Sequence, residues 1–248
     1  LIRMTSLKKK TYYLLKRVNK AISEFNLIED GDRIAVAVSG GKDSLTLLRL
    51  LIQRQSYSKE KYKVGAVHII SDFKCKGCVH RITLENIFKS YNIDYGFEHI
   101  NVLNDGKGNR IPPSCFWCSW NRRKAIFLWA SKNNYNKVAF GHHQDDLLET
   151  VFLNLFFHSN LETMEPRVSF FNGEITVIRP LIYLKEKDII SFVKLTNFPS
   201  QLCSCPNASN SKRTFVKDFI KKIEPEIKHF RNNVWKASRK WVSLSKRD

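Results

Sequence analysis

Short apolar runs separated by amphipathic segments divide most of the chain into alternating strands and helices. The segments at 33–39 and 64–70 are mostly apolar and too short for helices, which is typical of buried strands. Three further runs of this kind predict strands at 95–102, 137–141 and 175–181. Apolar residues at helical spacing predict helices at 43–54, 80–92, 121–133, 145–157 and 185–196.

Strands that alternate with helices at this spacing predict the α/β class, a parallel sheet with helices on both faces. Outside this core, residues 7–26 have the apolar spacing of an amphipathic helix, and the tail from Asn207 is helical and basic. We therefore expect an N-terminal basic helix over 1–30, an α/β domain over 31–206 and a basic helical tail over 207–248.

The net charge of +19 comes largely from the two ends of the chain. Residues 1–20 contain seven basic and no acidic side chains, and residues 207–248 contain twelve basic and four acidic ones. This distribution indicates a polyanionic partner, although a lysine-rich composition alone is the simpler alternative. Charge does not separate RNA from DNA or from an anionic membrane surface.

Two features of hydropathy bear on location. The chain has no run of about 18 apolar residues, so we expect no membrane-spanning segment. The opening LIRMTSLKKK lacks the apolar core of a secretory signal peptide, and we expect a cytoplasmic protein.

The segment SGGKDS at 39–44 lies between the first predicted strand and the helix that follows it. Backbone N–H groups and the helix dipole at such a boundary favour a phosphate, and Lys42 adds a positive charge. Position 36 is valine, so the segment is not the Walker sequence, and it is not G-x-G-x-x-G either. Asp43, an acid inside an anion-binding loop, makes electrostatic sense when a metal ion accompanies the phosphate.

A second polar motif, GHHQDD at 141–146, follows the predicted strand at 137–141. Asp145 and Asp146 carry the oxygen ligands that Mg²⁺ prefers. The adjacent histidines, including His142, suit phosphate contact or proton transfer, but an ordinary helix N-cap with two surface histidines is the alternative. His68 ends the second predicted strand, where it either meets a nucleotide or packs in the core.

The six cysteines form close pairs: Cys75 with Cys78, Cys115 with Cys118, and Cys203 with Cys205. In a reducing compartment such pairs indicate metal or redox chemistry before structural disulfides. Two metal interpretations remain open from the residues alone. Four thiolates would close the shell of a zinc ion, and three would hold an iron–sulfur cluster with one iron open.

Several motifs resemble a known family. SGGKDS resembles the PP-loop of the ATP pyrophosphatase superfamily, and PPSCFWCSWNRRKAIF resembles the C-x-x-C-S-x-x-R-R stretch of its tRNA 2-thiocytidine synthetase branch. The segments FGHHQDDLLETVFLNLFF, VIRPLIYLKEKDI and FPSQLC are similar to that branch in the same order. The resemblance extends over about residues 11–215.

This resemblance implies an enzyme that cleaves ATP between its α- and β-phosphates, with Mg²⁺, to adenylate the C2 oxygen of a tRNA pyrimidine and replace it with sulfur. Cytidine is the base that it implies, and uridine remains open. It places ATP at Ser39, Gly40, Gly41, Lys42, Asp43, Ser44, His68, Gly141 and His142. It places a [4Fe–4S] cluster on Cys115, Cys118 and Cys203, and catalytic roles on Asp43, Asp145 and Cys203.

The resemblance also implies partners. These are tRNA, a sulfur donor that is either hydrosulfide or a cysteine desulfurase persulfide, and a second copy of the chain in a homodimer. The sequence departs from the family at CSC, where a C-x-x-C is usual, and CKGC has no counterpart there.

Basic and aromatic residues cluster next to the second cysteine pair. Arg122, Arg123 and Lys124 lie beside three tryptophans, an arrangement suited to a flipped-out base and its phosphates. The alternative is that the tryptophans pack in the core. Arg213 likewise is either an RNA contact or a residue with a structural role only. Two other functions remain open: a cluster-free sulfurtransferase or ligase that uses a cysteine persulfide, and a zinc-stapled RNA-binding protein.

Overall fold

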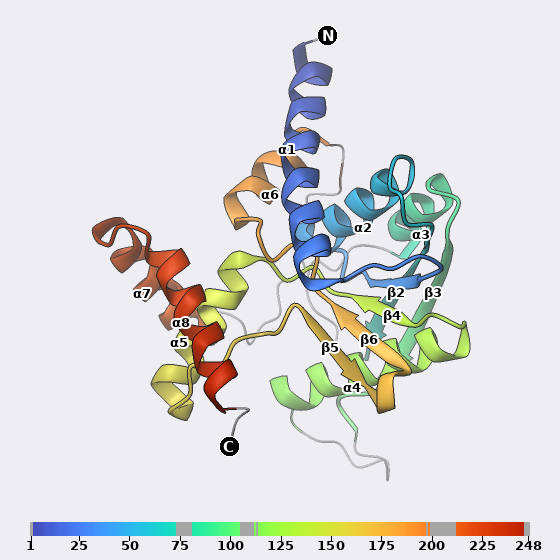
Figure 1. Cartoon of the computed structure of the whole chain (residues 1–248). Coiled ribbons are helices and arrows are strands. Elements are labelled where there is room, and N and C mark those ends of the chain that lie inside the picture. Colours follow the sequence, from blue (N-terminus) through green and yellow to red (C-terminus); the bar gives the residue numbers. More distant parts are fainter. Residues whose placement is uncertain are drawn as a thin grey trace.

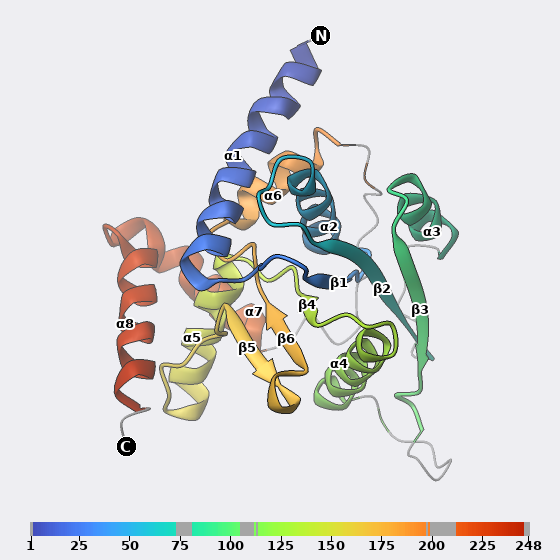
Figure 2. The ribbon, with the colours of Figure 1, turned by 45° about the vertical axis from the view of Figure 1, so that its right-hand side comes forward.

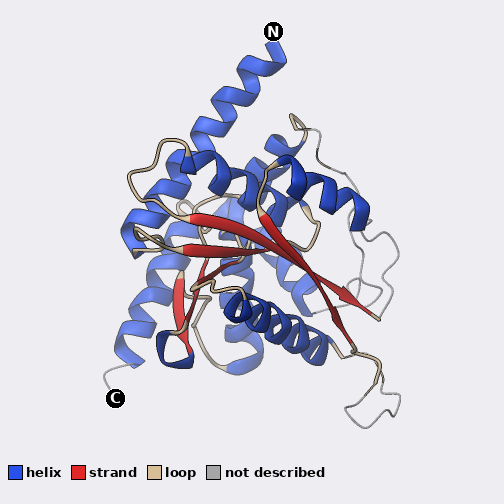
Figure 3. Cartoon of the chain, turned by 90° about the vertical axis from the view of Figure 1, so that its right-hand side faces the viewer, coloured by secondary structure: helices blue, strands red, loops and turns tan. Residues whose placement is uncertain are grey.

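The computed structural model describes residues 2–72, 81–104, 112, 114–196, 198 and 212–245. Its centre is a six-stranded sheet with the order β3-β2-β1-β4-β6-β5 (Figures 1 and 3). All neighbouring strands pair in parallel except β5 and β6, which are antiparallel. The strands are β1 (Arg33–Ala37), β2 (Lys63–Ser71), β3 (Asp94–Ile100), β4 (Lys137–Ala139), β5 (Arg167–Phe170) and β6 (Ile175–Ile178).

Helices precede, connect and follow these strands. They are α1 (Ile2–Phe25), α2 (Lys42–Gln55), α3 (Arg81–Ser90), α4 (Cys115–Lys132), α5 (Gln144–His158), α6 (Glu186–Val193), α7 (Lys212–Ile223) and α8 (Phe230–Ser245), with 3₁₀ turns η1 (Phe171–Gly173) and η3 (Glu224–Glu226). Within the described part of the chain, these helices are all too short or too polar to cross a bilayer.

Helices cover both faces of the sheet, as the sequence predicted (Figure 3). Alternate residues of a strand point to opposite faces, so Ile34 and Val36 pack with α1, α2, α3 and α6. Ala35 packs on the other face with Val67 and with the buried side of α4. The expected α/β class is therefore confirmed.

Two local features differ from the expectation. β5 was not expected, and it adds an antiparallel edge strand to an otherwise parallel sheet. α4 begins at Cys115 rather than at residue 121, because Ser114 caps it by accepting a hydrogen bond from the Trp117 backbone N–H at 3.3 Å. Both cysteines of the second pair therefore lie in the first turn of a helix.

The two basic ends of the chain pack on different helices of this core and come close to each other, with Arg239 of α8 lying 5.0 Å from the ring centroid of Phe25 in α1. α1 buries Leu14, Val18 and Ile22 against α2 and α6, while its N-terminal end projects beyond the rest of the molecule (Figures 1 and 2). α7 and α8 pack on α5 through the buried Leu148, Ile220 and Phe230.

Two glycines of the sheet make room for aromatic rings of the α4 face. A Cβ at Gly96 would clash with the indole of Trp129, and one at Gly65 would clash with the phenol ring of Tyr135. The two rings stack on each other with centroids 5.2 Å apart. Trp129 is therefore a buried packing residue, in line with the core alternative for this tryptophan.

We predict that Gly96→Ala lowers the free energy of unfolding by about 1–3 kcal/mol, because the added methyl group must displace a packed indole. Urea unfolding of wild type and variant measures this loss. In a Trp129→Leu background the same glycine substitution should cost less, since the clashing ring is gone. An equal cost in both backgrounds would contradict the explanation.

Candidate functional site

Two loops meet at the carboxyl edge of the sheet. Residues 39–44 follow β1 and residues 141–143 follow β4, and these two strands pair in parallel. A Cβ at Gly141 would lie only 3.0 Å from the carbonyl carbon of Asp43 and from the backbone nitrogen of Ser44. Glycine is therefore needed at 141, because only a residue without a side chain allows the backbones to come this close.

The 39–44 loop is held in shape by its own serines. Ser44 Oγ donates to the Gly41 carbonyl at 3.0 Å and accepts from the Ser39 N–H at 3.2 Å. Gly40 adopts a φ of +85°, which favours glycine. The loop opens directly into α2, so its free N–H groups and the helix dipole favour an anion at this point.

Lys42 is held between two carboxylates. Its Nζ lies 3.0 Å from Asp43 Oδ2 and 3.0 Å from Glu186 Oε1. Burial acts to lower the pKa of Lys42, but these carboxylates raise it above its usual value. Burial likewise opposes ionisation of Glu186, yet hydrogen bonds from Lys42 and Lys217 hold the pKa of Glu186 at about 2. Both charges are therefore present at neutral pH.

Asp43 also faces the second loop. Its Oδ1 is buried without a hydrogen-bond partner and lies 3.7 Å from Nε2 of the buried His143. The other ring nitrogen of His143 lies 3.4 Å from Asp146 Oδ2, which accepts the His143 backbone N–H at 2.9 Å. An unpartnered buried carboxylate oxygen fits a cation, so Asp43 together with Asp146 would hold Mg²⁺. Asp145, the other expected Mg²⁺ ligand, is paired with Arg231.

His142 is largely buried beside Arg179. Burial lowers the pKa of His142 to about 4, and the positive charge of Arg179 adds to this effect. The Nδ1 atom of His142 is buried without a partner. Burial also lowers the pKa of Arg179 to about 10, so it remains cationic at neutral pH. At neutral pH the site therefore presents a neutral imidazole next to a guanidinium.

A cavity of about 380 Å³ connects these groups with α4. This volume is within the range of small-molecule sites. Its walls include Ser39, Asp43, Ser44, Gly141, His142 and Asp146 from the two loops, and Ser119, Arg122 and Arg123 from α4. His68 is not among the lining residues; its Nδ1 lies 2.7 Å from the Val38 carbonyl, and burial lowers its pKa. His68 thus supports the wall of the site from within the sheet.

The second cysteine pair lies at the start of α4, beside this cavity. Cys115 is exposed and Cys118 is half-buried, and both are free thiols. Arg122 donates from Nε to Cys118 Sγ at 3.4 Å and from Nη1 to the Ile69 carbonyl at 3.4 Å. Two neighbouring thiols with a cationic donor fit an iron–sulfur cluster or zinc. Cys203, Cys205, Cys75 and Cys78 lie outside the described residues.

Several acidic residues of the site pair with the C-terminal helices. Asp145 accepts from Arg231 at 2.8 Å and from the Glu186 backbone N–H at 2.7 Å. Arg213, expected to contact RNA, donates to Glu149 at 2.8 Å and lies 3.7 Å from Asp146. No group of three or more His, Cys, Asp or Glu side chains is arranged to hold a metal within the described segments.

Glu186 and Arg179 were not predicted as site residues from the sequence. Both lie in the VIRPLIYLKEKDI segment, whose resemblance to the family was the available signal. The remaining predicted contact, Lys124, is exposed on α4 with its Nζ 5.3 Å from the centroid of the Trp120 ring.

We predict that His142 makes the stability of the protein depend on pH between about 6.5 and about 4. The pKa of His142 in the folded protein lies below its usual value of 6.5. The unfolded chain therefore binds more protons in this range, and stability falls as the pH is lowered. Urea unfolding at several pH values should show a shallower fall for His142→Gln than for wild type. His99→Gln, at an exposed histidine, is the control, and an identical pH dependence in wild type and His142→Gln would contradict the prediction.

The chain matches a known protein family and is similar in sequence to known enzymes. A model of the PP-loop domain matches residues 12–227. The tRNA-cytidine(32) 2-sulfurtransferase of Geotalea uraniireducens is 37% identical over 89% of this chain and 88% of its own length. The corresponding enzyme of Geobacter sulfurreducens is 40% identical over 84% of this chain and 82% of its own.

A solved structure has the same fold. The U34-tRNA thiolase NcsA from Methanococcus maripaludis, determined with its [4Fe–4S] cluster, superposes with a TM-score of 0.67. The superposition covers 98% of this chain and 78% of that one, at 18% sequence identity. The resemblance that the motifs predicted is thus confirmed, and the chain belongs to the PP-loop family that includes the tRNA-cytidine(32) 2-sulfurtransferases.

Proposed function

We propose that this chain is an ATP-dependent tRNA sulfurtransferase that converts a cytidine to 2-thiocytidine. The observation that carries the proposal is the single cavity bounded by the PP-loop, the GHH loop and the α4 turn bearing Cys118. A base bound in this cavity would be close both to the loops proposed to bind ATP and to the thiols at the start of α4. The names of the relatives support tRNA as substrate and cytidine 32 as the modified position.

The first step uses the two loops. The C2 oxygen of the base attacks the α-phosphorus of ATP, and pyrophosphate leaves. Lys42 and the N–H groups at the start of α2 stabilise the charge that develops on the leaving group. Lys42 has to exchange Glu186 for phosphate oxygens, and Glu186 retains Lys217 as its partner at 3.0 Å.

The second step replaces the adenylated oxygen with sulfur and releases AMP. A [4Fe–4S] cluster held by Cys115, Cys118 and Cys203 would supply the sulfur as a nucleophile at neutral pH. Arg122 orients Cys118 through its hydrogen bond to the sulfur and is itself held by the Ile69 carbonyl. Arg123 lines the same cavity, where a guanidinium suits the phosphates of ATP or of the RNA.

Exposed aromatic rings near the thiols suit an unpaired base. Trp117 and Trp120 stack with centroids 5.5 Å apart, and Trp120 is 44% exposed. Lys124 adds a positive charge beside them. Stacking on such rings is the common way in which proteins bind a base removed from a helix.

We predict that Asp43→Asn lowers ATP-dependent thiolation about 100-fold or more while tRNA affinity stays within about twofold of wild type. The physical reason is that Asp43 carries the buried, unpartnered carboxylate oxygen that would hold Mg²⁺, whereas most of the proposed RNA contacts come from cationic and aromatic side chains elsewhere. Mass spectrometry of digested tRNA measures 2-thiocytidine. Glu174→Gln, at an exposed acid in the turn after η1, is the control. Unchanged turnover in Asp43→Asn would refute the proposed role of the loop.

We predict about four irons per chain after anaerobic purification, lost in both Cys115→Ser and Cys118→Ser. Iron, sulfide and zinc analysis of each protein measures this. Zinc in place of iron would favour the zinc-stapled alternative. Thiolation that persists without any metal would favour a persulfide on one of the cysteines.

A further inference from the structure

The two basic ends of the chain, about 200 residues apart in the sequence, meet at a second cavity. This cavity has a volume of about 390 Å³ and lies between α1, the start of α6 and the start of α8. Its polar and charged lining residues include Arg17, Gln144, Lys185, Glu224, His229 and Arg231.

The lining carries an excess of positive charge from three separate elements. Arg17 comes from α1, Lys185 precedes α6 and Arg231 begins α8. Arg231 is engaged by Asp145 at 2.8 Å and by Glu224. Glu224 is the acidic lining residue of the cavity, and its pKa is lowered by the hydrogen bonds of Arg231 and further by Lys185. Two cations, Arg17 and Lys185, therefore remain without a carboxylate of their own among the described residues.

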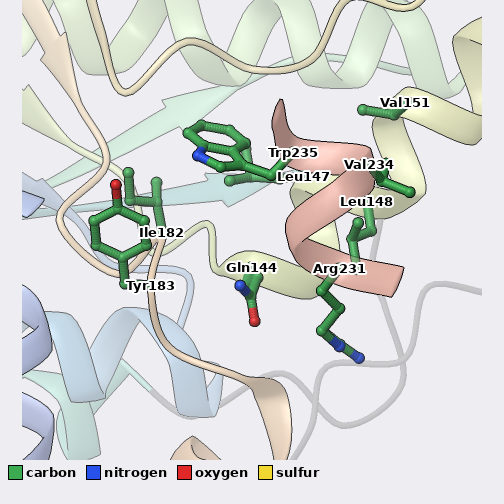
Figure 4. Close-up of a pocket in the computed structure, with 9 residues that line it drawn as sticks. All are labelled: Gln144, Leu147, Leu148, Val151, Ile182, Tyr183, Arg231, Val234 and Trp235. Carbon is green, nitrogen blue, oxygen red and sulfur yellow. The ribbon is translucent and has the colours of Figure 1, made fainter. Parts of the chain in front are cut away.

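Donor groups in the cavity are not fully used. Arg17 gives one N–H, from Nη1, to the Tyr183 carbonyl at 3.0 Å, which leaves the rest of its guanidinium available. Nη1 of Arg231 is buried without a partner, although its other nitrogens are paired. Figure 4, a close-up of a neighbouring, more apolar pocket that shares Gln144 and Arg231 with this cavity, shows these two side chains extending away from Trp235. The remaining N–H groups of Arg17 and the ammonium group of Lys185 are thus donors that this polar cavity offers to an acceptor-rich ligand.

The cavity borders the proposed catalytic site. Lys185 immediately precedes Glu186, the residue that holds Lys42 of the PP-loop. Gln144 immediately follows His143 and precedes Asp145. The wall of the cavity is therefore formed in part by the direct chain neighbours of Glu186 and Asp145.

We propose that this cavity binds a backbone phosphate of the RNA substrate through Arg17 and Lys185, with Arg231 in the cavity wall beside them. Guanidinium and ammonium groups recognise phosphate rather than base identity, so the contact positions the RNA without reading its sequence. The inference rests on the proposed function, because it assumes an RNA substrate. In this proposal, basic residues from both ends of the chain lie beside the same phosphate group.

The test is a binding titration of the full chain with a fluorescently labelled tRNA transcript that carries cytidine at position 32, the position named for the relatives. We expect Lys185→Gln to weaken binding about 3- to 10-fold near 0.1 M salt and to reduce the slope of log K against log salt by about one. Arg17→Gln should have a similar effect. Lys59→Gln, at an exposed lysine in the loop before β2, is the matched control and should change neither quantity.

Each outcome decides between interpretations. ATP affinity, measured in parallel, should be unchanged in Lys185→Gln, and thermal unfolding of both variants shows whether the fold is retained. Unchanged tRNA affinity in folded Lys185→Gln and Arg17→Gln overturns the inference and leaves the proposed function standing. Loss of ATP affinity with normal tRNA affinity assigns the cavity to the nucleotide and also overturns it. Failure of wild type to bind the transcript is instead a failure of the proposed function.

Discussion

The close approach of Gly141 to the backbone of Asp43 and Ser44 is the constraint on which the site depends. It joins the loop after β1 to the loop after β4, so that the imidazole of His143 lies between two carboxylates, 3.7 Å from Asp43 Oδ1 and 3.4 Å from Asp146 Oδ2. Parallel pairing of β1 with β4 brings the loops to the same edge, and the glycine allows them to touch.

Charge pairs connect this edge to the C-terminal helices. Arg213 and Lys217 of α7 and Arg231 of α8 contact Glu149, Glu186 and Asp145, respectively. The apolar side of the same helices packs on α5 through Leu148, Ile220 and Phe230. The tail is thus part of the site as well as a source of positive charge. A basic segment of sequence does not reveal this, because the carboxylates that it meets are distant along the chain.

Much of the fold followed from local patterns. The buried runs of β1 and β2 and the amphipathic spacing of α2 and α5 are properties of short segments, and they were predicted correctly. β5 was missed because its four residues are half-exposed and are recognisable only once they pair with β6. The start of α4 was missed because C-F-W-C has no apolar periodicity and the helix depends on the cap from Ser114.

The site was predictable only in part. SGGKDS and GHHQDD are recognisable from their residue types alone, and residues of both segments line one cavity in the structure. Glu186 and Arg179 have no such signature, since a single glutamate or arginine gains its role from the neighbours that folding supplies. Family resemblance pointed to the right segment but not to the individual side chains.

The pairing of Lys42 with Asp43 and Glu186 has a consequence for how the nucleotide and the RNA respond to ionic strength. Phosphate entering the loop replaces a carboxylate that already neutralises Lys42, so this step exchanges one anion for another and releases few counterions. If the basic ends bind RNA as proposed, that step would instead displace condensed ions from the polyanion itself. Salt would then weaken RNA binding much more than nucleotide binding, so that one change in ionic strength would separate the two binding events.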